Sequence, residues 1–450
     1  MVSASASTKK KKSKKGAKRK PVNLQSNFNR KCSVRVVAKD DGGDHEANEQ
    51  VFEISADMFP SNAHATADIQ ARSQFSDDGD VGSTGGFALG DFHLHSLCSD
   101  GKLKPREVIA KAAENGVVYM SLTDHDTMAG VSEAMEAAQE LNVLVIPGVE
   151  ISAEVKGGEN LHILGFFFPG SNSAELEQQL EKIRFGRHKR GKAMLAKLVN
   201  SNSEEYVTSI KSQAEMGIKL EWDRILEIAG EAAPGRPHVA QALVEAGYVP
   251  HFREAFNRYL GNNGPAYVEG EHFPPEDAIR LIKSAGGVSV LAHPWCCKVD
   301  RSCADPMKLI PDLAKLGIQG VEVYHDTSKI GMYGALAKES DLLRLGGSDF
   351  HGIDPNTERS PGEIPLPKKH IDIFLEHAKR IWERPLRQRL RAIAEEPSPA
   401  ADESSVLIWN EQLAFAREVV ESELGLTLKV DGERGHYCRV KLLRRGDRVN

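Results

Sequence analysis

Two histidines separated by one residue have the spacing of a metal-binding pair. In a strand, side chains two residues apart share a face, so His93 and His95 would point the same way while Phe92 and Leu94 pack on the opposite face. Imidazole is a common metal ligand. Asp100 follows on the expected loop and adds a carboxylate. The segment therefore predicts part of a metal site.

Other imidazole and carboxylate side chains follow or lie within the remaining short apolar runs. Asp349 and His351 repeat the two-residue spacing after the run 342–347. The further candidates are Asp124, His125 and Asp126 after 120–122, Glu150 after 143–149, His162 within 161–166 and His293 after 288–292. Each histidine alone is better explained as a core or capping residue. Jointly this explanation fails, because so many buried imidazoles and carboxylates would need partners or a cation.

The elements that would position these side chains alternate between strands and helices. From residue 87 onward, short apolar runs alternate with helical periodicity, which indicates β-α units with parallel strands. An α/β barrel assembles its active site at the carboxyl ends of its strands, and nearly all the candidates fall there. Residues 171–265 interrupt the alternation and are rich in Glu, Lys, Arg, Ala and Leu at helical spacing. We expect a helical insert there.

The candidate residues and their surroundings resemble the PHP (polymerase and histidinol phosphatase) family of metal-dependent phosphoesterases, from about residue 90 to residue 351. The motifs are DFHLHSLCSDG (91–101), LTDHDT (122–127), PGVEIS (147–152), LHILGFF (161–167), LAHP (291–294) and GSDFHG (347–352). The resemblance implies an α/β fold, a distorted (β/α)7 barrel, whose mouth holds two to three divalent ions. It also implies nine metal ligands: His93, His95, Asp100, His125, Glu150, His162, His293, Asp349 and His351.

Metal chemistry follows from this ligand set. Mixed imidazole and carboxylate ligation suits manganese, iron or zinc, and the absence of thiolates speaks against structural zinc; we expect manganese. A metal-bound hydroxide would attack phosphorus, with Glu150 bridging two ions and His125 among their ligands. Asp124 would orient His125 or accept a proton, although a strand-end cap explains Asp124 nearly as well.

The insert resembles one branch of the family, through GRPHVA (235–240) and residues 242–248, 255–261 and 265–268. This branch includes bacterial nucleoside 3',5'-bisphosphate phosphatases, some of which are 5'-to-3' exoribonucleases on short RNA. The resemblance implies either activity, with a nucleotide or short RNA as substrate. A histidinol-phosphate type phosphatase and a non-catalytic metal- or RNA-binding module remain as alternatives.

Cationic side chains of the insert are the expected substrate-phosphate ligands. Arg236 and His238 are preferred because they lie in a Gly-Arg-Pro-His turn that leads into an apolar helix. Arg187 and Arg190 on the preceding helix are alternatives. For these two arginines, a solvated helix face is the better explanation.

Composition separates a globular centre from two extensions. The 450 residues are 40% hydrophobic and 27% charged, as in soluble globular proteins, and no apolar run could span a bilayer. Residues 1–85 are expected to be disordered, with a basic and then an acidic part. Residues 86–385 are expected to form the barrel and its insert, and 386–450 a flexible C-terminal extension of unknown role. Oligomeric state is not predicted.

The basic run Lys9–Lys20 leaves several functions open. It would contact nucleic acid, act as a nuclear import signal or serve as a solubilising tail, and an organellar transit peptide is a further alternative. The six cysteines show neither zinc-finger spacing nor the density of a secreted disulfide scaffold. We therefore expect an intracellular protein, with the cytoplasm or nucleus favoured over an organelle.

Overall fold

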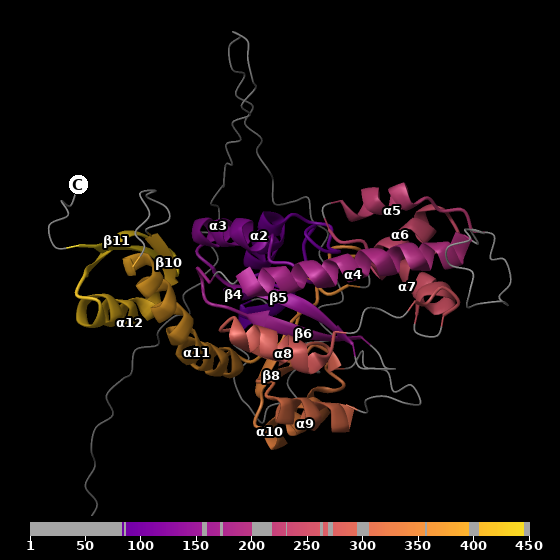
Figure 1. Cartoon of the computed structure of the whole chain (residues 1–450). Helices are drawn as coiled ribbons and strands as arrows, with labels where there is room; N and C mark the ends of the chain where they lie inside the picture. The colour runs from indigo at the N-terminus through magenta and orange to yellow at the C-terminus, as the bar shows by residue number, and fades with distance from the viewer. Residues whose placement is uncertain are drawn as a thin grey trace, which may run out of the picture. The chain divides into compact units, whose positions relative to one another are not determined.

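A seven-stranded sheet forms the centre of the fold, and its strands lie in chain order (Figure 1). They are β3 (Gly90–Leu94), β4 (Tyr119–Leu122), β5 (Leu144–Glu154), β6 (Asn160–Phe166), β7 (Val288–Leu291), β8 (Gly320–Tyr324) and β9 (Leu343–Gly346). A parallel bridge between Leu94 and Phe350 joins the first strand to the chain just after the last. The sheet is therefore a nearly closed barrel, as the sequence predicted.

The computed structural model describes only part of the chain. The described residues are 83–84, 87–154, 160–171, 174–199, 218–230, 232–261, 264–268, 273–294, 306–355, 358–395 and 405–444. All of them fall in one unit, residues 65–450. Apart from 83–84, the extension 1–85 that we expect to be disordered lies outside the described residues, and so does the run Lys9–Lys20.

One strand of the barrel runs against the others. β3, β4 and β5 are parallel, and so are β7, β8 and β9, but β6 pairs antiparallel with both of its neighbours. The expectation of parallel strands is wrong here, because only five residues separate the end of β5 from the start of β6, too few for the crossover that parallel neighbours require. As a result, the start of β6 lies at the same rim as the carboxyl ends of the neighbouring strands. This rim is the mouth of the barrel.

Helices cover the outside of the sheet. They are α2 (Pro105–Glu114), α3 (Val131–Leu141), α8 (Pro275–Ser284), α9 (Pro306–Leu316), α10 (Ile330–Glu339) and α11 (Lys368–Glu395). Phe92 on β3 and Phe166 on β6 pack against Phe374 of α11, with ring centroids 5.1 and 5.3 Å away. Burying one such ring stabilises the fold by roughly 1.5–3 kcal/mol. The register of β3 against β4 shifts between Asp91 and Leu94, so the strict alternation of Phe92, His93 and Leu94 between two faces stays a prediction.

The insert between β6 and β7 is helical in its described parts. It contains α4 (Ala174–Val199), α5 (Trp222–Ala229), α6 (Arg236–Glu245), α7 (Phe252–Ala255) and a π-helical turn (Phe256–Leu260). The end of α4 joins α5–α7 in a hydrophobic core of their own, which includes Leu198 and Leu243. The start of α4 packs into the barrel core through Leu176 and Leu180. α4 thus links the barrel to the other insert helices (Figure 1).

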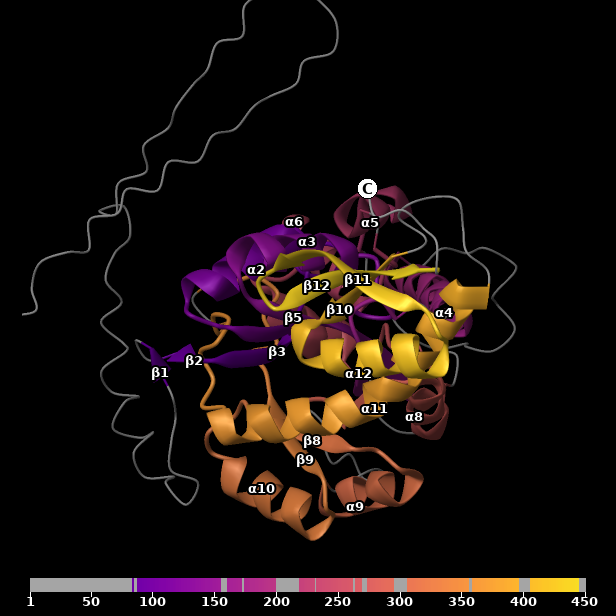
Figure 2. The same ribbon diagram turned by 90° about the vertical axis from the view of Figure 1, so that its left-hand side faces the viewer.

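The C-terminal residues form a small sheet, and the expectation of a flexible extension over 386–450 is wrong for residues 405–444. The elements are β10 (Ser405–Trp409), a 3-10 turn (Asn410–Gln412), α12 (Leu413–Glu418), a π-helical turn (Val419–Glu423), β11 (Thr427–Arg434) and β12 (Tyr437–Leu443). The strand order is β10-β12-β11, and its buried side chains belong to the barrel core. The predicted boundary at residue 386 lies inside α11. Figure 2 shows this sheet in yellow.

The hydroxyl group of Tyr437 ties the C-terminal sheet to the barrel. It accepts the backbone N–H of Val145 at 2.6 Å and donates to the carbonyl of Val145 at 2.7 Å. Burial raises the pKa of this hydroxyl. Both groups of one β5 residue are therefore satisfied by a side chain almost three hundred residues away.

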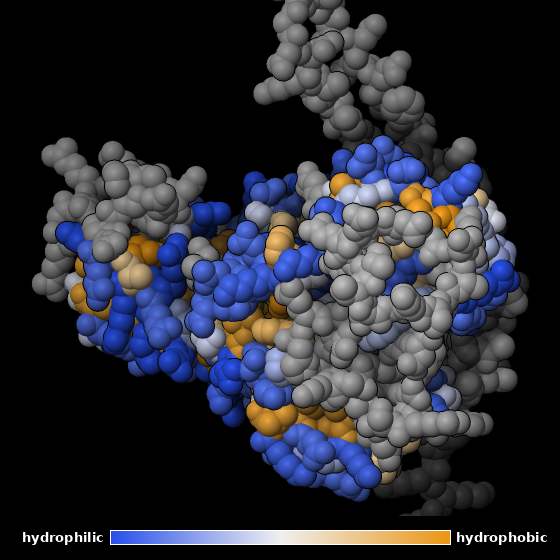
Figure 3. Space-filling view, turned by 45° about the vertical axis from the view of Figure 1, so that its right-hand side comes forward, coloured by the Kyte–Doolittle hydropathy of each residue, from blue (hydrophilic) through white to orange (hydrophobic). Residues whose placement is uncertain are grey.

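The remaining described strands, β1 (Ser83–Thr84) and β2 (Phe87–Ala88), form a separate pair. Hydrophilic residues cover much of the face shown in Figure 3, and apolar residues form smaller patches between them. Within the described ranges, no helix combines the length and the apolar content that a membrane span requires.

Candidate metal centre

Nine imidazole and carboxylate side chains meet at the mouth of the barrel, and together they form what we call the metal centre. They belong to four overlapping groups in which the ligand atoms lie within 4.8 Å of one another. The groups are His95, Asp100, His125 and His351; His93, His95 and Asp349; His93, Glu150 and His293; and His125, Glu150 and His162. The structure thus brings together every residue that the sequence predicted as a ligand.

Glu150 lies at the centre of this arrangement. Its Oε2 atom is 3.2 Å from Nε2 of both His93 and His95, which reach it from the same face of the chain around β3. Its Oε1 atom is 2.7 Å from Nδ1 of His162 and 3.0 Å from Nε2 of His293. A carboxylate with imidazoles around both oxygen atoms has the position required of a ligand that bridges two cations.

The antiparallel strand explains how His162 reaches the metal centre. His162 is the third residue of β6, whereas the other ligands stand in or after strands of the opposite direction. Its place near the start of β6 lies opposite Ser152, just beyond Glu150 on β5. Reversal of one strand therefore moves a residue near its beginning to the mouth.

Buried atoms without a hydrogen-bond partner test whether cations fit this site. Among the described residues, these atoms include His93 Nε2, His95 Nε2, His125 Nδ1 and Glu150 Oε2, all from the metal centre. An unpaired buried polar atom costs on the order of 1–3 kcal/mol, so several in one place require a shared partner. Divalent cations would supply it, and imidazole with carboxylate suits manganese, iron or zinc. The side chains of the metal centre therefore fit bound divalent cations.

Charges inside the metal centre shift the pKa values of its members. Burial alone would raise the pKa of Glu150, but His125, His162 and His93 hold it well below its usual range. Burial would likewise lower the pKa of His351, yet Asp100 and Asp349 raise it to about 10. The pKa values of His93 and His95 are also raised, whereas that of His125 is lowered well below its usual range. In the absence of cations, protons on His93, His95 and His351 therefore balance the carboxylates, and a bound cation must displace some of them.

Two buried carboxylates that sequence reasoning missed support the ligands from behind. Glu322 on β8 accepts a hydrogen bond from Nδ1 of His93 at 3.2 Å and another from the backbone N–H of His293 at 2.8 Å. Asp91 accepts the backbone N–H groups of Ser348 at 3.0 Å and Gly362 at 2.7 Å. Burial raises the pKa of Asp91 to about 6 despite these hydrogen bonds. For Glu322, a carboxylate inside the otherwise apolar strand β8 was the signal available in the sequence.

Asp124 fixes the loop that carries Asp100. Its carboxylate accepts the backbone N–H of Ser96 at 2.7 Å, the Ser96 hydroxyl at 2.7 Å and the Ser99 hydroxyl at 2.6 Å. Within the described part of the chain, none of its hydrogen bonds goes to His125. These contacts match a capping and loop-fixing role better than the proton-accepting role considered from the sequence.

Arg187 and Arg190 are both engaged by neighbouring residues, so a solvated helix face is the wrong explanation for them. The side chain of Arg187 is only 18% exposed and pairs with the buried Asp126 at 2.8 Å. Burial would lower the pKa of Arg187, but Asp126 and Asp100 raise it. Arg190 instead donates to the carbonyl of Val268 at 2.7 Å. Arg187 thus faces the metal centre, whereas Arg190 holds another segment of the chain.

His238 and Arg236 also occupy different surroundings. Nε2 of His238 lies 3.2 Å from the carbonyl of Ser99, one residue before Asp100, and burial lowers the pKa of His238 to about 4. The guanidinium group of Arg236 lies 6.0 Å from the ring centre of Phe256, within the insert. Of the four cationic candidates, His238 and Arg187 therefore lie beside the metal centre.

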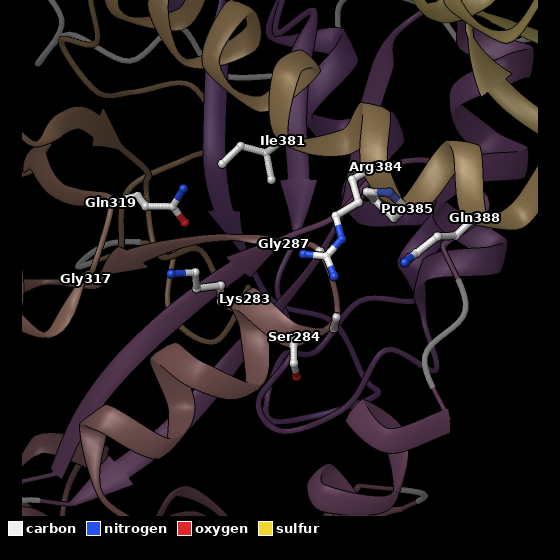
Figure 4. Close-up of a pocket in the computed structure, with 11 residues that line it drawn as sticks. Lys283, Ser284, Gly287, Gly317, Gln319, Ile381, Arg384, Pro385 and Gln388 are labelled. Atoms are coloured by element: carbon white, nitrogen blue, oxygen red, sulfur yellow. The ribbon is translucent and has the colours of Figure 1, made fainter. Parts of the chain in front are cut away.

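A separate pocket lies at the opposite end of the strands (Figure 4). It measures about 260 Å³, and its lining includes Lys283, Gln319, Arg384 and Gln388. Gln319 directly precedes β8, whereas the metal centre lies beyond the other end of that strand. The pocket also borders the C-terminal ends of α8 and α9, where positive side chains are stabilising. The pocket is therefore separate from the metal centre.

Comparison with known proteins relates this geometry to a family. The model of the PHP domain family matches residues 91–262. The chain is 34% identical to a 5'-3' exoribonuclease of Haemophilus influenzae, over 58% of the chain and 89% of the relative. It is 32% identical to a 3',5'-nucleoside bisphosphate phosphatase of Chromobacterium violaceum, over 65% of the chain and 94% of the relative.

A solved structure gives the same relation. A proposed metal-dependent phosphoesterase of Bifidobacterium adolescentis superposes with a TM-score of 0.53 at 28% sequence identity. The match covers 64% of the chain and 95% of that structure. Both the sequence and the arrangement of the barrel are thus shared with phosphoesterases.

Proposed function

Because the chain belongs to the PHP family of metal-dependent phosphoesterases, we propose that it hydrolyses nucleotide phosphoesters at the metal centre. It would remove the 3'-phosphate of a nucleoside 3',5'-bisphosphate such as pAp, or release 5' nucleotides from short RNA. The observation that carries the proposal is the set of buried, unpartnered donor atoms around Glu150. The choice of nucleotide substrates is supported by what the two bacterial relatives are named for.

The nine side chains would hold two or three divalent ions, with manganese as our proposed metal. Such ions polarise a phosphoryl group and lower the pKa of bound water. The chain's own part is to present neutral imidazoles and ionised carboxylates in fixed orientations. Glu322 orients His93 in this way. It accepts a hydrogen bond from Nδ1–H of His93, which leaves the lone pair of Nε2 directed at the metal centre.

Arg187 would bind substrate phosphate beside the ions, whereas His238 would fix the loop that carries Asp100, because its Nδ1 accepts the backbone N–H of Gly235 and its Nε2 donates to the carbonyl of Ser99. Arg187 stays positively charged, and its pairing with Asp126 uses only part of its set of donors. His238 stays neutral at physiological pH because its pKa is lowered. We rank Arg187 ahead of Arg236, because Arg236 lies over Phe256 in the insert. A 5'-phosphate held by Arg187 would bring the adjacent 3' bond to the ions.

A substrate panel tests the proposal. Purified full-length protein supplied with manganese would be assayed on pAp, 5'-phosphorylated short RNA, AMP and histidinol phosphate. We expect cleavage of pAp or RNA with kcat/KM at least about tenfold above that for histidinol phosphate, equivalent to about 1.4 kcal/mol. Efficient hydrolysis of histidinol phosphate alone would replace the nucleotide proposal with the histidinol-phosphate alternative. No hydrolysis of any substrate would favour the non-catalytic binding module.

A further inference from the structure

Lys102 stands at the edge of the metal centre, two residues after the candidate ligand Asp100. Its backbone N–H donates to the carbonyl of His351, another candidate ligand, at 2.8 Å. The backbone of Ser96 also accepts the N–H of Gly101, which closes the turn between them at 3.0 Å. The position of Lys102 is therefore fixed by the same loop that delivers Asp100.

The ammonium group of Lys102 has a neutral hydrogen-bond partner. Nζ donates to the side-chain oxygen of Gln241 on α6, and the described residues include no carboxylate in ion-pair contact with it. An amide oxygen accepts one N–H but compensates no charge, and an ammonium group has three donors. The carboxylates that act on its charge are Glu245 and then Asp100. Since Glu245 is ion-paired with Arg224 at 2.6 Å and Asp100 would be engaged by cations, the charge of Lys102 is available to another anion.

The face of α6 turned toward the mouth places Lys102 near His238 and, through it, near Arg187, the candidate phosphate contact on α4. His238, Gln241 and Glu245 recur at helical spacing on this face, and His238 contacts Ser99 while Gln241 contacts Lys102. Both Arg187 and Lys102 act on His238, since each helps to lower its pKa. His238 thus lies within the field of two cations, one on the insert helix α4 and one on the barrel loop.

We infer that Lys102 is a specificity-determining residue that binds the phosphate group not being cleaved, so that the enzyme prefers substrates with two phosphates over simple monoesters. The inference rests on the proposed nucleotide phosphoesterase function. The ions would engage one phosphate, and a second phosphate at the edge of the metal centre would meet the positive charge of Lys102. A substrate without that second phosphate would make no contact with Lys102 and would be indifferent to its loss.

A purely structural role for Lys102 predicts a different result. Its contact with Gln241 also joins the barrel loop to the insert, so loss of Lys102 could act by loosening α6. Gln241→Ala removes that contact but keeps the ammonium group. It is therefore the matched variant that separates the charge of Lys102 from its bridging contact.

The test compares substrates with one and two phosphates in the manganese-supplied full-length protein. We expect Lys102→Met to raise the KM for pAp by about 10- to 100-fold, the range for a hydrogen bond to a charged group. KM for p-nitrophenyl phosphate should change less than about twofold, and Lys102→Arg should restore most of the affinity for pAp. Gln241→Ala and Lys104→Met, an exposed lysine of the same loop, should resemble the unmodified protein.

Two results would overturn the role of Lys102. One is equal loss of both substrates in Lys102→Met, and the other is a Gln241→Ala variant as impaired on pAp as Lys102→Met. An unchanged KM for pAp in Lys102→Met would also exclude it. Failure of the underlying function would look different, because the unmodified protein would then cleave p-nitrophenyl phosphate but not pAp.

Discussion

The carboxylate of Glu322 accepts a hydrogen bond from Nδ1 of His93, over a distance of 3.2 Å. Glu322 belongs to β8, in which every residue is buried. His93 can then offer only Nε2 to the metal centre, 3.2 Å from Glu150. The same carboxylate accepts the backbone N–H of His293, so one side chain fixes two candidate ligands. A buried carboxylate with these contacts is a positioning residue whose loss should affect metal affinity.

We therefore expect Glu322→Gln to weaken metal binding by about 10- to 100-fold, the usual effect of losing a residue that orients a ligand. Titration of the metal-free protein with manganese measures this, and circular dichroism checks that the variant is folded. Glu339→Gln, an exposed position on α10, serves as the control. An unchanged manganese affinity in folded Glu322→Gln would show that His93 needs no orienting partner.

Metal removal should abolish turnover and make the remaining protein sensitive to pH. Beside Asp100, the pKa of His351 is raised to about 10 without cations, against about 6.5 in the unfolded chain. The stabilisation from this pair is then fully present below about pH 6.5 and lost as pH rises toward about 10. Binding of manganese must displace such protons, so its affinity should rise with pH.

Calorimetry in buffers of different ionisation enthalpy would measure protons released on manganese binding. Thermal unfolding of the chelator-treated protein from pH 6 to pH 10 would follow the loss of the pair. Restored turnover after manganese addition is the control for irreversible damage. Manganese affinity that does not change over this range would contradict proton displacement from the imidazoles.

Tyr437→Phe tests whether the C-terminal sheet contributes to the stability of the barrel. Removing the hydroxyl leaves the N–H and carbonyl of Val145 without this partner, which should cost about 1–3 kcal/mol of unfolding free energy. Urea unfolding measures the change, and kcat of the folded protein should be unaffected. Tyr119→Phe, on the half-buried first residue of β4, provides a comparison for loss of a hydroxyl alone. Equal stability of the two variants would show that the Tyr437 contact adds nothing.

The metal centre could be predicted from sequence because its ligands are encoded locally. His93 and His95 share a face by strand periodicity, and the other ligands stand in or next to short apolar runs. The sequence did not reveal that Glu322 orients candidate ligands, because nothing in its own strand indicates which histidine its carboxylate contacts. That contact depends on β8 and β3 approaching around the barrel, which is a property of the whole fold.

Long-range packing also explains the other differences. The direction of β6 depends on its pairing with β5 and β7 rather than on its own apolar pattern. Within the predicted flexible extension 386–450, Ser405–Trp409 form a strand because β12, later in the chain, pairs with them. The cationic side chains of the insert stay predicted phosphate contacts, and which arginine faces the mouth depends on how α4 docks.

Because α4 brings Arg187 close to the metal centre, we expect Arg187→Ala to impair turnover of pAp more than Arg236→Ala does. Arg187 lies within hydrogen-bonding distance of Asp126 beside the metal centre, whereas Arg236 lies over Phe256 in the insert. Loss of a desolvated charge that binds a phosphate costs about 2–5 kcal/mol, so Arg187→Ala should lower kcat/KM for pAp at least about 30-fold. Arg236→Ala should cost less than about tenfold. Both variants should retain manganese, because neither arginine belongs to the metal centre.

Steady-state kinetics with parallel metal analysis distinguishes the two positions, and Arg187→Lys shows whether the guanidinium geometry or only the charge is needed. A larger effect at Arg236 than at Arg187 would return the phosphate contact to the Gly-Arg-Pro-His turn and would mean that Arg187 mainly holds Asp126 in place.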